Sequence, residues 1–96
     1  MKVYGILDVD IHDPEKYKEY MVRAKPLIDA AGGRYLTRGG KHTVHEGDWH
    51  PSRLVIVEFP SQEAMDSFYF SDAYKEVKAI RESCSTTRMV SVEGAD

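Results

Sequence analysis

Two strand-forming segments, residues 3–9 and 53–59, carry apolar side chains on both of their faces. Because side chains alternate along a strand, each of these segments must be covered by other structure on both sides. In a chain of 96 residues, only a few layered arrangements of helices and strands can cover both faces of such segments. One face carries Val3, Leu7, Val9, Val55, Val57 and Phe59, and the other carries Tyr4, Ile6, Leu54 and Ile56.

A helix is predicted between the first strand and a glycine pair. Residues 14–31 have the spacing of an amphipathic helix, with Asp13 as the N-cap and Pro14 at the first helical position. Pro26 lies inside this pattern and is expected to kink or briefly break the helix. Gly32-Gly33 is expected to end it, with one glycine in the left-handed conformation.

A long hairpin is predicted next. Residues 34–38 favour a second strand, and residues 41–46 look extended again. We interpret Gly39-Gly40 between them as a bulge rather than a chain reversal. Turn-forming residues at 47–52 then lead into the strand 53–59.

The second half of the chain predicts another helical region and a last strand. Ser61 is expected to cap the helical region, and Ser71 is expected to interrupt and restart it before a fourth strand at 86–92. The order strand, helix, strand, strand, helix, strand is the split βαβ pattern. It predicts an α+β, ferredoxin-like fold with both helices on one face of a four-stranded antiparallel sheet. Residues 1–96 are expected to form a single domain.

The second face of this sheet predicts a homodimer. Two helices cover one face only, so the apolar side chains on the other would form a large exposed patch. The simplest cover is the same face of a second copy, which gives a two-fold interface and a dimeric α+β barrel. The alternative is a sheet face that is only moderately apolar and partly wet.

Composition excludes several classes of function. Thirteen basic and 16 acidic residues give a net charge of -3, and the scattered basic residues offer no footprint for nucleic acid. The aliphatic run Leu54–Val57 is too short to cross a membrane. Asp8, Asp10 and Asp13 stand where a signal peptide needs its apolar core, and the single Cys84 forms no internal disulfide. We therefore expect a cytoplasmic protein.

The hairpin provides the first candidate site. Arg38 lies beside the glycine pair, and a guanidinium there is suited to clamping a carboxylate or phosphate. Arg53 would assist in binding, Trp49 would form an apolar wall, and Glu46 or His45 would move protons. The structural alternative is an Arg–Glu ion pair that holds the hairpin or bridges a dimer.

The strand ends provide a second candidate. In this topology, the first and third strands are predicted to run parallel at the sheet centre, so Asp8 and Glu58 are expected near the same end. The antiparallel fourth strand brings Arg88 to that end as well. Two carboxylates around one cation could give a general base with a raised pKa. The alternative is a solvated salt-bridge cluster at the rim of the sheet.

The second helical region provides a third candidate. Tyr74 and Arg81 are seven residues apart and therefore share one side of a helix, where they would line a ligand pocket. The alternative is ordinary packing with a snorkelling guanidinium. Cys84 on the same side is interpreted as a small hydrophobic residue.

The histidines do not predict a metal site. His42 and His45 are three residues apart and would point to opposite faces of a strand, and His50 lies further along. We therefore predict no metal and no cofactor, and keep one histidine as a candidate proton shuttle.

Six short motifs carry a resemblance to a known family. They are Arg38-Gly39-Gly40, Glu46-Gly47-Asp48-Trp49, Glu58-Phe59-Pro60-Ser61, Ser71-Asp72-Ala73-Tyr74, Arg81 and Val92-Glu93-Gly94. With these motifs in this order, the chain resembles a bacterial family of small domains of unknown function, family 1330, in the dimeric α+β barrel superfamily. The resemblance covers the whole chain and implies a ferredoxin-like protomer and a sheet-to-sheet dimer. It implies no activity, although wider relatives include cofactor-free monooxygenases, lactone isomerases and haem-binding enzymes.

Two functional hypotheses follow from the sequence. The first is a domain that binds a small anionic or aromatic molecule, or an enzyme-like relative that needs no cofactor, with Arg38 as the anchor. The second is a non-catalytic homodimer that serves as an interaction or stress-associated module. It is supported by the lack of any recognised catalytic motif in the sequence.

Overall fold

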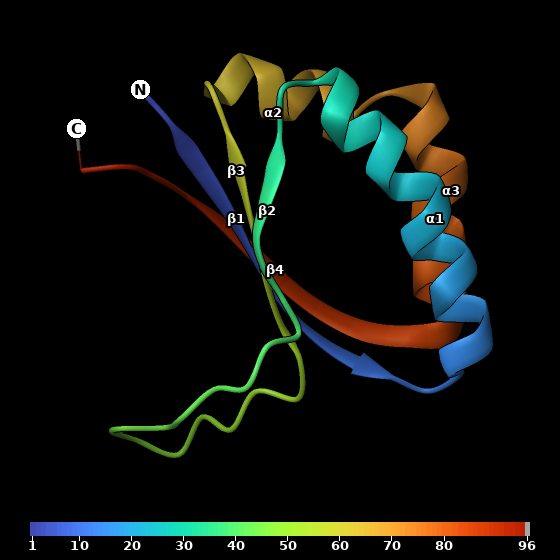
Figure 1. Ribbon diagram of the computed structural model, residues 1–96. Coiled ribbons are helices and arrows are strands. Elements are labelled where there is room, and N and C mark those ends of the chain that lie inside the picture. Colours follow the sequence, from blue (N-terminus) through green and yellow to red (C-terminus); the bar gives the residue numbers. More distant parts are fainter. Residues whose placement is uncertain (96) are drawn as a thin grey trace.

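Three helices lie on one side of a four-stranded antiparallel sheet, and the other side of the sheet is open (Figure 1). The computed structural model describes residues 1–95. The predicted α+β, ferredoxin-like fold is confirmed, with the second helical region divided into two helices. In chain order the elements are β1 (Val3–Ile11), α1 (Pro14–Ala30), β2 (Arg34–Arg38), β3 (Leu54–Phe59), α2 (Gln62–Tyr69), α3 (Asp72–Cys84) and β4 (Ser85–Glu93).

The helices begin at the predicted caps. The side chains of Asp13, Ser61 and Ser71 each accept a hydrogen bond from the backbone N–H three residues later, at 3.2, 3.1 and 3.0 Å. Gly32, with φ of 79°, follows the end of α1 in the left-handed conformation. The predicted break at Pro26 is wrong, because α1 continues through it. Pro26 is exposed, so the carbonyl that loses its donor can be hydrated.

The strand order is β2-β3-β1-β4, and all neighbouring strands are antiparallel. The prediction that β1 and β3 run parallel is therefore wrong. The crossover through α1 makes β2 parallel to β1, and the hairpin then reverses the chain into β3. As a result, Tyr4 lies opposite Glu58 and Asp8 lies opposite Leu54, at the two ends of β1.

The hairpin between β2 and β3 is shorter than predicted. The irregularity in β2 lies between Tyr35 and Thr37, not at the glycine pair. Residues 39–53 contain no helix or strand and project from one end of the sheet (green loop, Figure 1), so the extended stretch expected at 41–46 forms no strand. Gly39, with φ of 75°, closes the strand pair by donating its N–H to the carbonyl of Leu54 at 2.8 Å.

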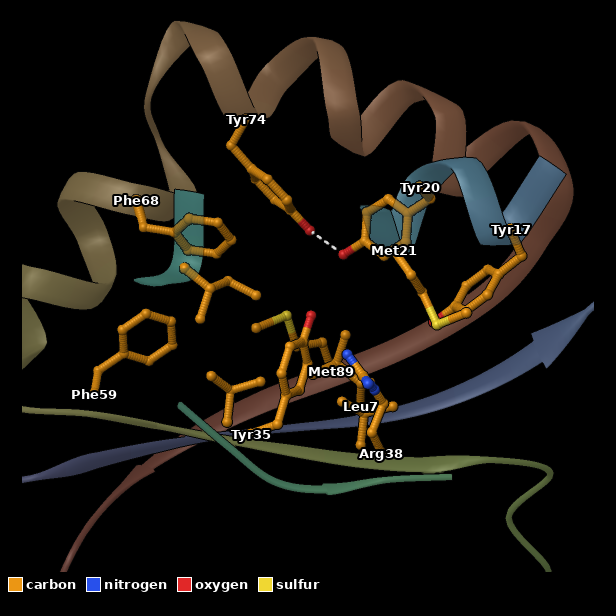
Figure 2. Close-up of a pocket in the computed structure, with 13 residues that line it drawn as sticks. Leu7, Tyr17, Tyr20, Met21, Tyr35, Arg38, Phe59, Phe68, Tyr74 and Met89 are labelled. Carbon is orange, nitrogen blue, oxygen red and sulfur yellow. Dashed lines mark hydrogen bonds between the residues drawn. The ribbon is translucent and has the colours of Figure 1, made fainter. Parts of the chain in front are cut away.

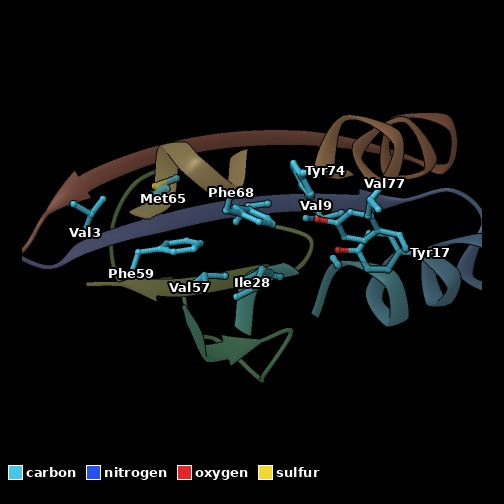
Figure 3. Packing of buried hydrophobic residues seen from close by; sticks show 14 of the residues in the cluster. Val3, Val9, Tyr17, Ile28, Val57, Phe59, Met65, Phe68, Tyr74 and Val77 are labelled. Atoms are coloured by element: carbon cyan, nitrogen blue, oxygen red, sulfur yellow. Dashed lines mark hydrogen bonds between the residues drawn. The ribbon is translucent and has the colours of Figure 1, made fainter. Parts of the chain in front are cut away.

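The core lies between the sheet and the helices, where the side chains of β1 and β3 that face inward meet α1, α2 and α3 (Figure 3). Phe59 of β3 stacks on Phe68 of α2, with ring centroids 5.6 Å apart. The other side of the sheet, here called the open face, keeps much of its apolar surface uncovered: Val90 is 64% exposed and Val92 is 52% exposed. The two-faced pattern of the sequence is thus borne out in the fold.

Candidate functional site

A cavity lies between α1, α3 and the sheet (Figure 2). It is mostly apolar, and the polar groups in its wall are tyrosine hydroxyls and one guanidinium. Its free volume is about 30 Å³, room for roughly two water molecules. The residues that line it are Leu7, Tyr17, Tyr20, Met21, Ile28, Tyr35, Arg38, Val55, Val57, Phe59, Phe68, Tyr74 and Met89.

The irregularity in β2 aims Arg38 at this cavity. Residues three apart on a regular strand point to opposite faces, so Tyr35 and Arg38 would be separated. One extra residue between them restores the same side, and both pair with inward-facing residues of β3, Val57 and Val55. The guanidinium carbon of Arg38 lies 4.8 Å from the ring centre of Tyr35, within cation–π range.

A groove of about 640 Å³ adjoins the cavity on the outer side of α1. Met21 and Arg38 line both spaces and therefore form the boundary between the cavity and the groove. The surface of the groove is mostly apolar, and its charged side chains are predominantly basic. Its one acidic side chain, Asp29, is paired with Lys25 at 2.7 Å. The other residues that line the groove are Lys18, Val22, Pro26 and Arg53.

Arg53 brings a second guanidinium to the groove that Arg38 also lines. Its Nη2 lies 3.5 Å from Sδ of Met21, and its guanidinium carbon lies 5.7 Å from the ring centre of Tyr17. Its Nε is buried without a hydrogen-bond partner among residues 1–95. Gly39 makes room for this side chain, because a Cβ there would lie 2.6 Å from the guanidinium carbon of Arg53.

A chain of hydrogen bonds runs behind the cavity. Arg81 Nη1 donates to the hydroxyl of Tyr74 at 3.1 Å, and that hydroxyl lies 2.8 Å from the hydroxyl of Tyr20 (dashed line, Figure 2). Burial raises the pKa of both tyrosines, and the neighbouring Tyr74 raises that of Tyr20 further. Burial also raises the pKa of Tyr35 to about 12. These hydroxyls are therefore protonated at neutral pH and are available as hydrogen-bond donors.

The structure brings four of the predicted binding residues to this region. Arg38 and Tyr74 line the cavity, Arg53 lines the adjoining groove, and Arg81 contacts Tyr74 from behind. Trp49 does not join them, because it lies against Asp8 at the open face.

The two predicted proton-transfer residues, Glu46 and His45, are also separate from the cavity. Both are exposed in the segment 39–53 and line neither the cavity nor the groove. Within residues 1–95, no contact links either side chain to the cavity or the groove.

The predicted strand-end cluster does not form as a unit. Asp8 and Arg88 do lie opposite each other on β1 and β4. Asp8 accepts hydrogen bonds from Nε1 of Trp49 and from the backbone N–H of Ser52, each at 3.0 Å. The bond from Trp49 is the main reason why the pKa of Asp8 is lowered, not raised.

Glu58 lies at the opposite end of the sheet, because β3 is antiparallel to β1. There it binds Nε of Arg34 at 2.7 Å and contacts Nζ of Lys2 at 3.4 Å. The hydrogen bond from Arg34 is the main cause of its lowered pKa. Neither carboxylate of the predicted cluster therefore has the raised pKa that a general base would need.

Sequence reasoning missed Tyr17, Tyr20 and Tyr35 as site residues. The first two belong to the apolar stripe of the amphipathic helix α1 and are 3% and 6% exposed, so they also pack in the core. The available signal was the residue type: buried tyrosines must place their hydroxyls against a partner or in a cavity. Cys84, 1% exposed, packs in the core as expected.

The histidines of the segment 39–53 are all exposed. Among residues 1–95, no three side chains of the metal-ligating types come together. Within the same residues, no helix is both long enough and apolar enough to span a membrane.

Solved structures with the same fold include proteins of unknown function and one oxygenase. The RPA0582 protein of Rhodopseudomonas palustris, of unknown function, has a TM-score of 0.79 at 18% identity, covering 99% of this chain and 83% of its own. SnoaB, a cofactor-independent oxygenase of Streptomyces nogalater, has a TM-score of 0.75 at 14% identity, covering 99% and 94%. A dimeric ferredoxin-like protein of unknown function from Jannaschia sp. CCS1 has a TM-score of 0.65 at 11% identity, covering 98% and 100%.

No protein of curated function matches the sequence. The low identities of the structural relatives show the shared fold alone. Residues 2–95, in contrast, match one sequence family over nearly their whole length. The chain therefore belongs to the family described as domain of unknown function DUF1330.

Proposed function

We propose that this protein binds a small molecule whose apolar or aromatic body occupies the cavity and whose anionic group is held by Arg38 and Arg53. The observation that carries the proposal is a pair of guanidinium groups, Arg38 where the cavity meets the groove and Arg53 in the groove. Among residues 1–95, neither group forms an ion pair with a carboxylate. Two unpaired guanidinium groups beside an apolar cavity favour a carboxylate or phosphate ligand.

The size of the cavity requires a movement on binding. Ligand pockets usually measure about 300–1,000 Å³, well above the free volume between the helices and the sheet. Met21 separates the cavity from the groove of about 640 Å³, and methionine side chains change rotamer at little cost. We therefore expect Met21 and Arg38 to move apart and join the two spaces.

The fold supports this proposal without specifying a reaction. SnoaB, which shares the fold, is a cofactor-independent oxygenase. An enzyme that works without a cofactor can therefore be built on this fold, which agrees with a site formed by side chains alone.

The proposal is tested by thermal denaturation with cyclohexanecarboxylate, compared with its uncharged amide. A ligand at 100 times its Kd stabilises a protein by about 2.7 kcal/mol. For a domain of this size, that raises Tm by roughly 10–20 °C. We expect the carboxylate to stabilise the wild type, the amide to have little effect, and Arg38→Ala or Arg53→Ala to abolish the stabilisation.

Arg23→Gln is the matched control for these variants. Arg23 is exposed on α1 and lines neither the cavity nor the groove, so its replacement removes one positive charge without touching the site. An equal loss of binding in Arg23→Gln and Arg38→Ala would mean that net charge alone attracts the carboxylate, and the proposal would be wrong.

One observation favours the second candidate function, a non-catalytic interaction module. The cavity in its closed form holds only about two water molecules, as expected of a core that is never opened. This alternative predicts no stabilisation by any carboxylate and unchanged stability in Arg38→Ala.

We further propose that the chain forms a homodimer through the open face. Exposed Val90 and Val92 lie on β4 beside the half-buried Tyr4 and Ile6 of β1, which register opposite them. A patch of this kind is expected to be covered. A relative with the same fold, from Jannaschia sp. CCS1, is described as dimeric.

Sedimentation equilibrium tests the dimer. Val90→Lys would place a charge in the middle of the interface and is expected to yield monomers. Ala79→Lys adds the same charge on the exposed side of α3 and should remain dimeric. Dimers in both variants would place the interface elsewhere.

We also propose that residues 1–96 form one domain that acts in the cytoplasm. One core cluster extends across both halves of the chain, from Val3 to Cys84. The lone, buried Cys84 is suited to a reducing compartment.

A further inference from the structure

Arg81 is a buried cation without an opposite charge. The residue is 5% exposed, and its only side-chain hydrogen bond among residues 1–95 is the one from Nη1 to Tyr74. Its Nε has no partner, and no carboxylate of these residues forms an ion pair with it. Burying a charge without a counter-charge is costly, so the guanidinium depends on the two tyrosines: it bonds to Tyr74 and lies 6.0 Å from the ring centre of Tyr20.

The hydroxyls of Tyr20 and Tyr74 together have one proton that can be donated to a ligand. Arg81 donates to the oxygen of Tyr74, and one hydroxyl proton lies between Tyr74 and Tyr20. Two hydroxyls carry two protons, so one proton is left over whichever tyrosine is the donor in that bond. Both tyrosines line the cavity, and no other acceptor within residues 1–95 bonds to them.

Cooperativity favours one direction for the chain. A hydroxyl that accepts from a cation becomes a stronger donor, which favours donation from Tyr74 to Tyr20 and leaves the hydroxyl proton of Tyr20 available to the cavity. Figure 2 shows the two hydroxyls meeting above Tyr35, on the side of the cavity formed by the helices. Arg81 thus acts on the cavity through two neutral hydroxyls without reaching it.

We propose that the Tyr20–Tyr74 hydroxyl pair, polarised by Arg81, binds an oxygen atom of the ligand that carries negative charge, such as a phenolate or enolate oxygen. This inference rests on the proposed function, since it concerns the same cavity. It adds the chemistry of the inner end: the ligand has an acidic hydroxyl or a carbonyl there, and a carboxylate or phosphate at the outer end near Arg38 and Arg53. A hydroxy- or keto-substituted organic acid meets both conditions.

The polarised pair is expected to favour the anionic form of a phenol. Hydrogen bonds to the charged form and a nearby cation both lower the pKa of a bound acid. One unit of pKa corresponds to a tenfold preference for the anion. We expect the wild type to bind the phenolate at least roughly tenfold more tightly than the neutral phenol.

4-Nitrophenol is the probe, because its phenolate is coloured and it has no carboxylate for Arg38. Binding is measured by absorbance as a function of pH for the wild type, Tyr20→Phe and Arg81→Met. Tyr20→Phe removes the last donor of the chain, and Arg81→Met removes the charge while it keeps both hydroxyls. Arg81→Lys restores the charge, and Tyr4→Phe on the open face is the matched control for a lost hydroxyl.

The inference is supported if the preference for phenolate disappears in Tyr20→Phe and Arg81→Met but remains in Arg81→Lys and Tyr4→Phe. It is overturned if 4-nitrophenol does not bind, if the wild type binds both forms equally, or if the preference survives in both of the first two variants. Thermal unfolding confirms that each variant is folded. If Arg81→Met does not fold, Tyr20→Phe and the wild type decide the question.

Cyclohexanecarboxylate separates this inference from the proposed function, because it tests the outer end alone. If the carboxylate binds with dependence on Arg38 while phenolate is not preferred, the proposed function stands and the polarised pair is refuted. If phenolate is preferred with dependence on Arg81 while carboxylate binding is insensitive to Arg38, the anchor is refuted and the polarised pair stands.

Discussion

Gly39 leaves room for the guanidinium of Arg53 because it has no side chain. Its φ of 75° lies where residues with a Cβ are strained, and the guanidinium of Arg53 occupies the space that a side chain would need. Gly47 has a similar φ of 84°, but a Cβ added there would have no atom within 4 Å. Substitutions at these two glycines therefore distinguish the cost of backbone strain from the effect of displacing Arg53.

Gly39→Ala and Gly47→Ala are expected to lose similar stability and to differ in binding. Each substitution forces a left-handed alanine, which costs roughly 1–2 kcal/mol. Only Gly39→Ala displaces Arg53, so only this variant should lose affinity for cyclohexanecarboxylate. Urea denaturation and calorimetric titration measure the two effects. Equal affinities in the two variants would show that the position of Arg53 does not matter for binding.

Tyr74 and Tyr20 differ in what each hydroxyl supports. Tyr74→Phe removes the acceptor of a buried guanidinium, and hydrogen bonds to charged groups contribute about 1.5–3 kcal/mol. Tyr20→Phe removes a bond between neutral groups, which contributes about 1 kcal/mol. We expect the larger loss in the free energy of unfolding for Tyr74→Phe, measured by urea denaturation. The reverse order would mean that Arg81 finds another acceptor.

At the scale of elements, the sequence predicts individual helices and strands better than it predicts how the strands pair with one another. The caps, the strands and the two-faced apolar pattern are readable because each depends on residues near one another in sequence. The relative direction of β1 and β3 depends on how the hairpin reverses the chain, and that error misplaced Glu58. The irregularity that turns Arg38 inward depends on the pairing of β2 with β3. The sequence therefore identified Arg38 as a candidate but did not reveal why its side chain points toward the cavity.

The segment 39–53 is held to β1 by hydrogen bonds near its C-terminal end. Asp8 on β1 accepts hydrogen bonds from both Trp49 and Ser52 near the end of that segment. The pKa of Asp8 is lowered chiefly by the bond from Trp49, so the carboxylate is stabilised in the folded protein. This contribution is present above the ordinary pKa of an aspartate and is lost as the pH falls through the lower, folded value.

Trp49 reports this attachment directly, since it is the single tryptophan. Its fluorescence should stay constant at neutral pH and change only below about pH 4, when Asp8 becomes protonated. Asp8→Asn should remove this acid transition, and Asp10→Asn, which alters an exposed neighbour, should keep it. A transition that persists unchanged in Asp8→Asn would assign it to another group.

For the whole molecule, the buried tyrosines limit the stability of the folded protein at high pH. Burial raises the pKa values of Tyr17, Tyr20, Tyr35 and Tyr74, so the folded protein retains protons that the unfolded chain releases near pH 10. The stability that these groups contribute is complete below the unfolded pKa and is lost as the pH rises through the folded values. We expect the free energy of unfolding to decline between about pH 10 and pH 12. Constant stability over that range would contradict the burial of these hydroxyls.

The most direct test of a ligand site in this cavity is an NMR titration of the protein labelled at its methionine methyl groups. Met21 and Met89 line the cavity, whereas Met1 is 66% exposed and serves as an internal control. Addition of cyclohexanecarboxylate should shift the methyl signals of Met21 and Met89 in a saturable manner, leave Met1 unchanged, and have no effect in Arg38→Ala. Unchanged signals from Met21 and Met89 at saturating carboxylate, or equal shifts in Arg38→Ala, would contradict the account.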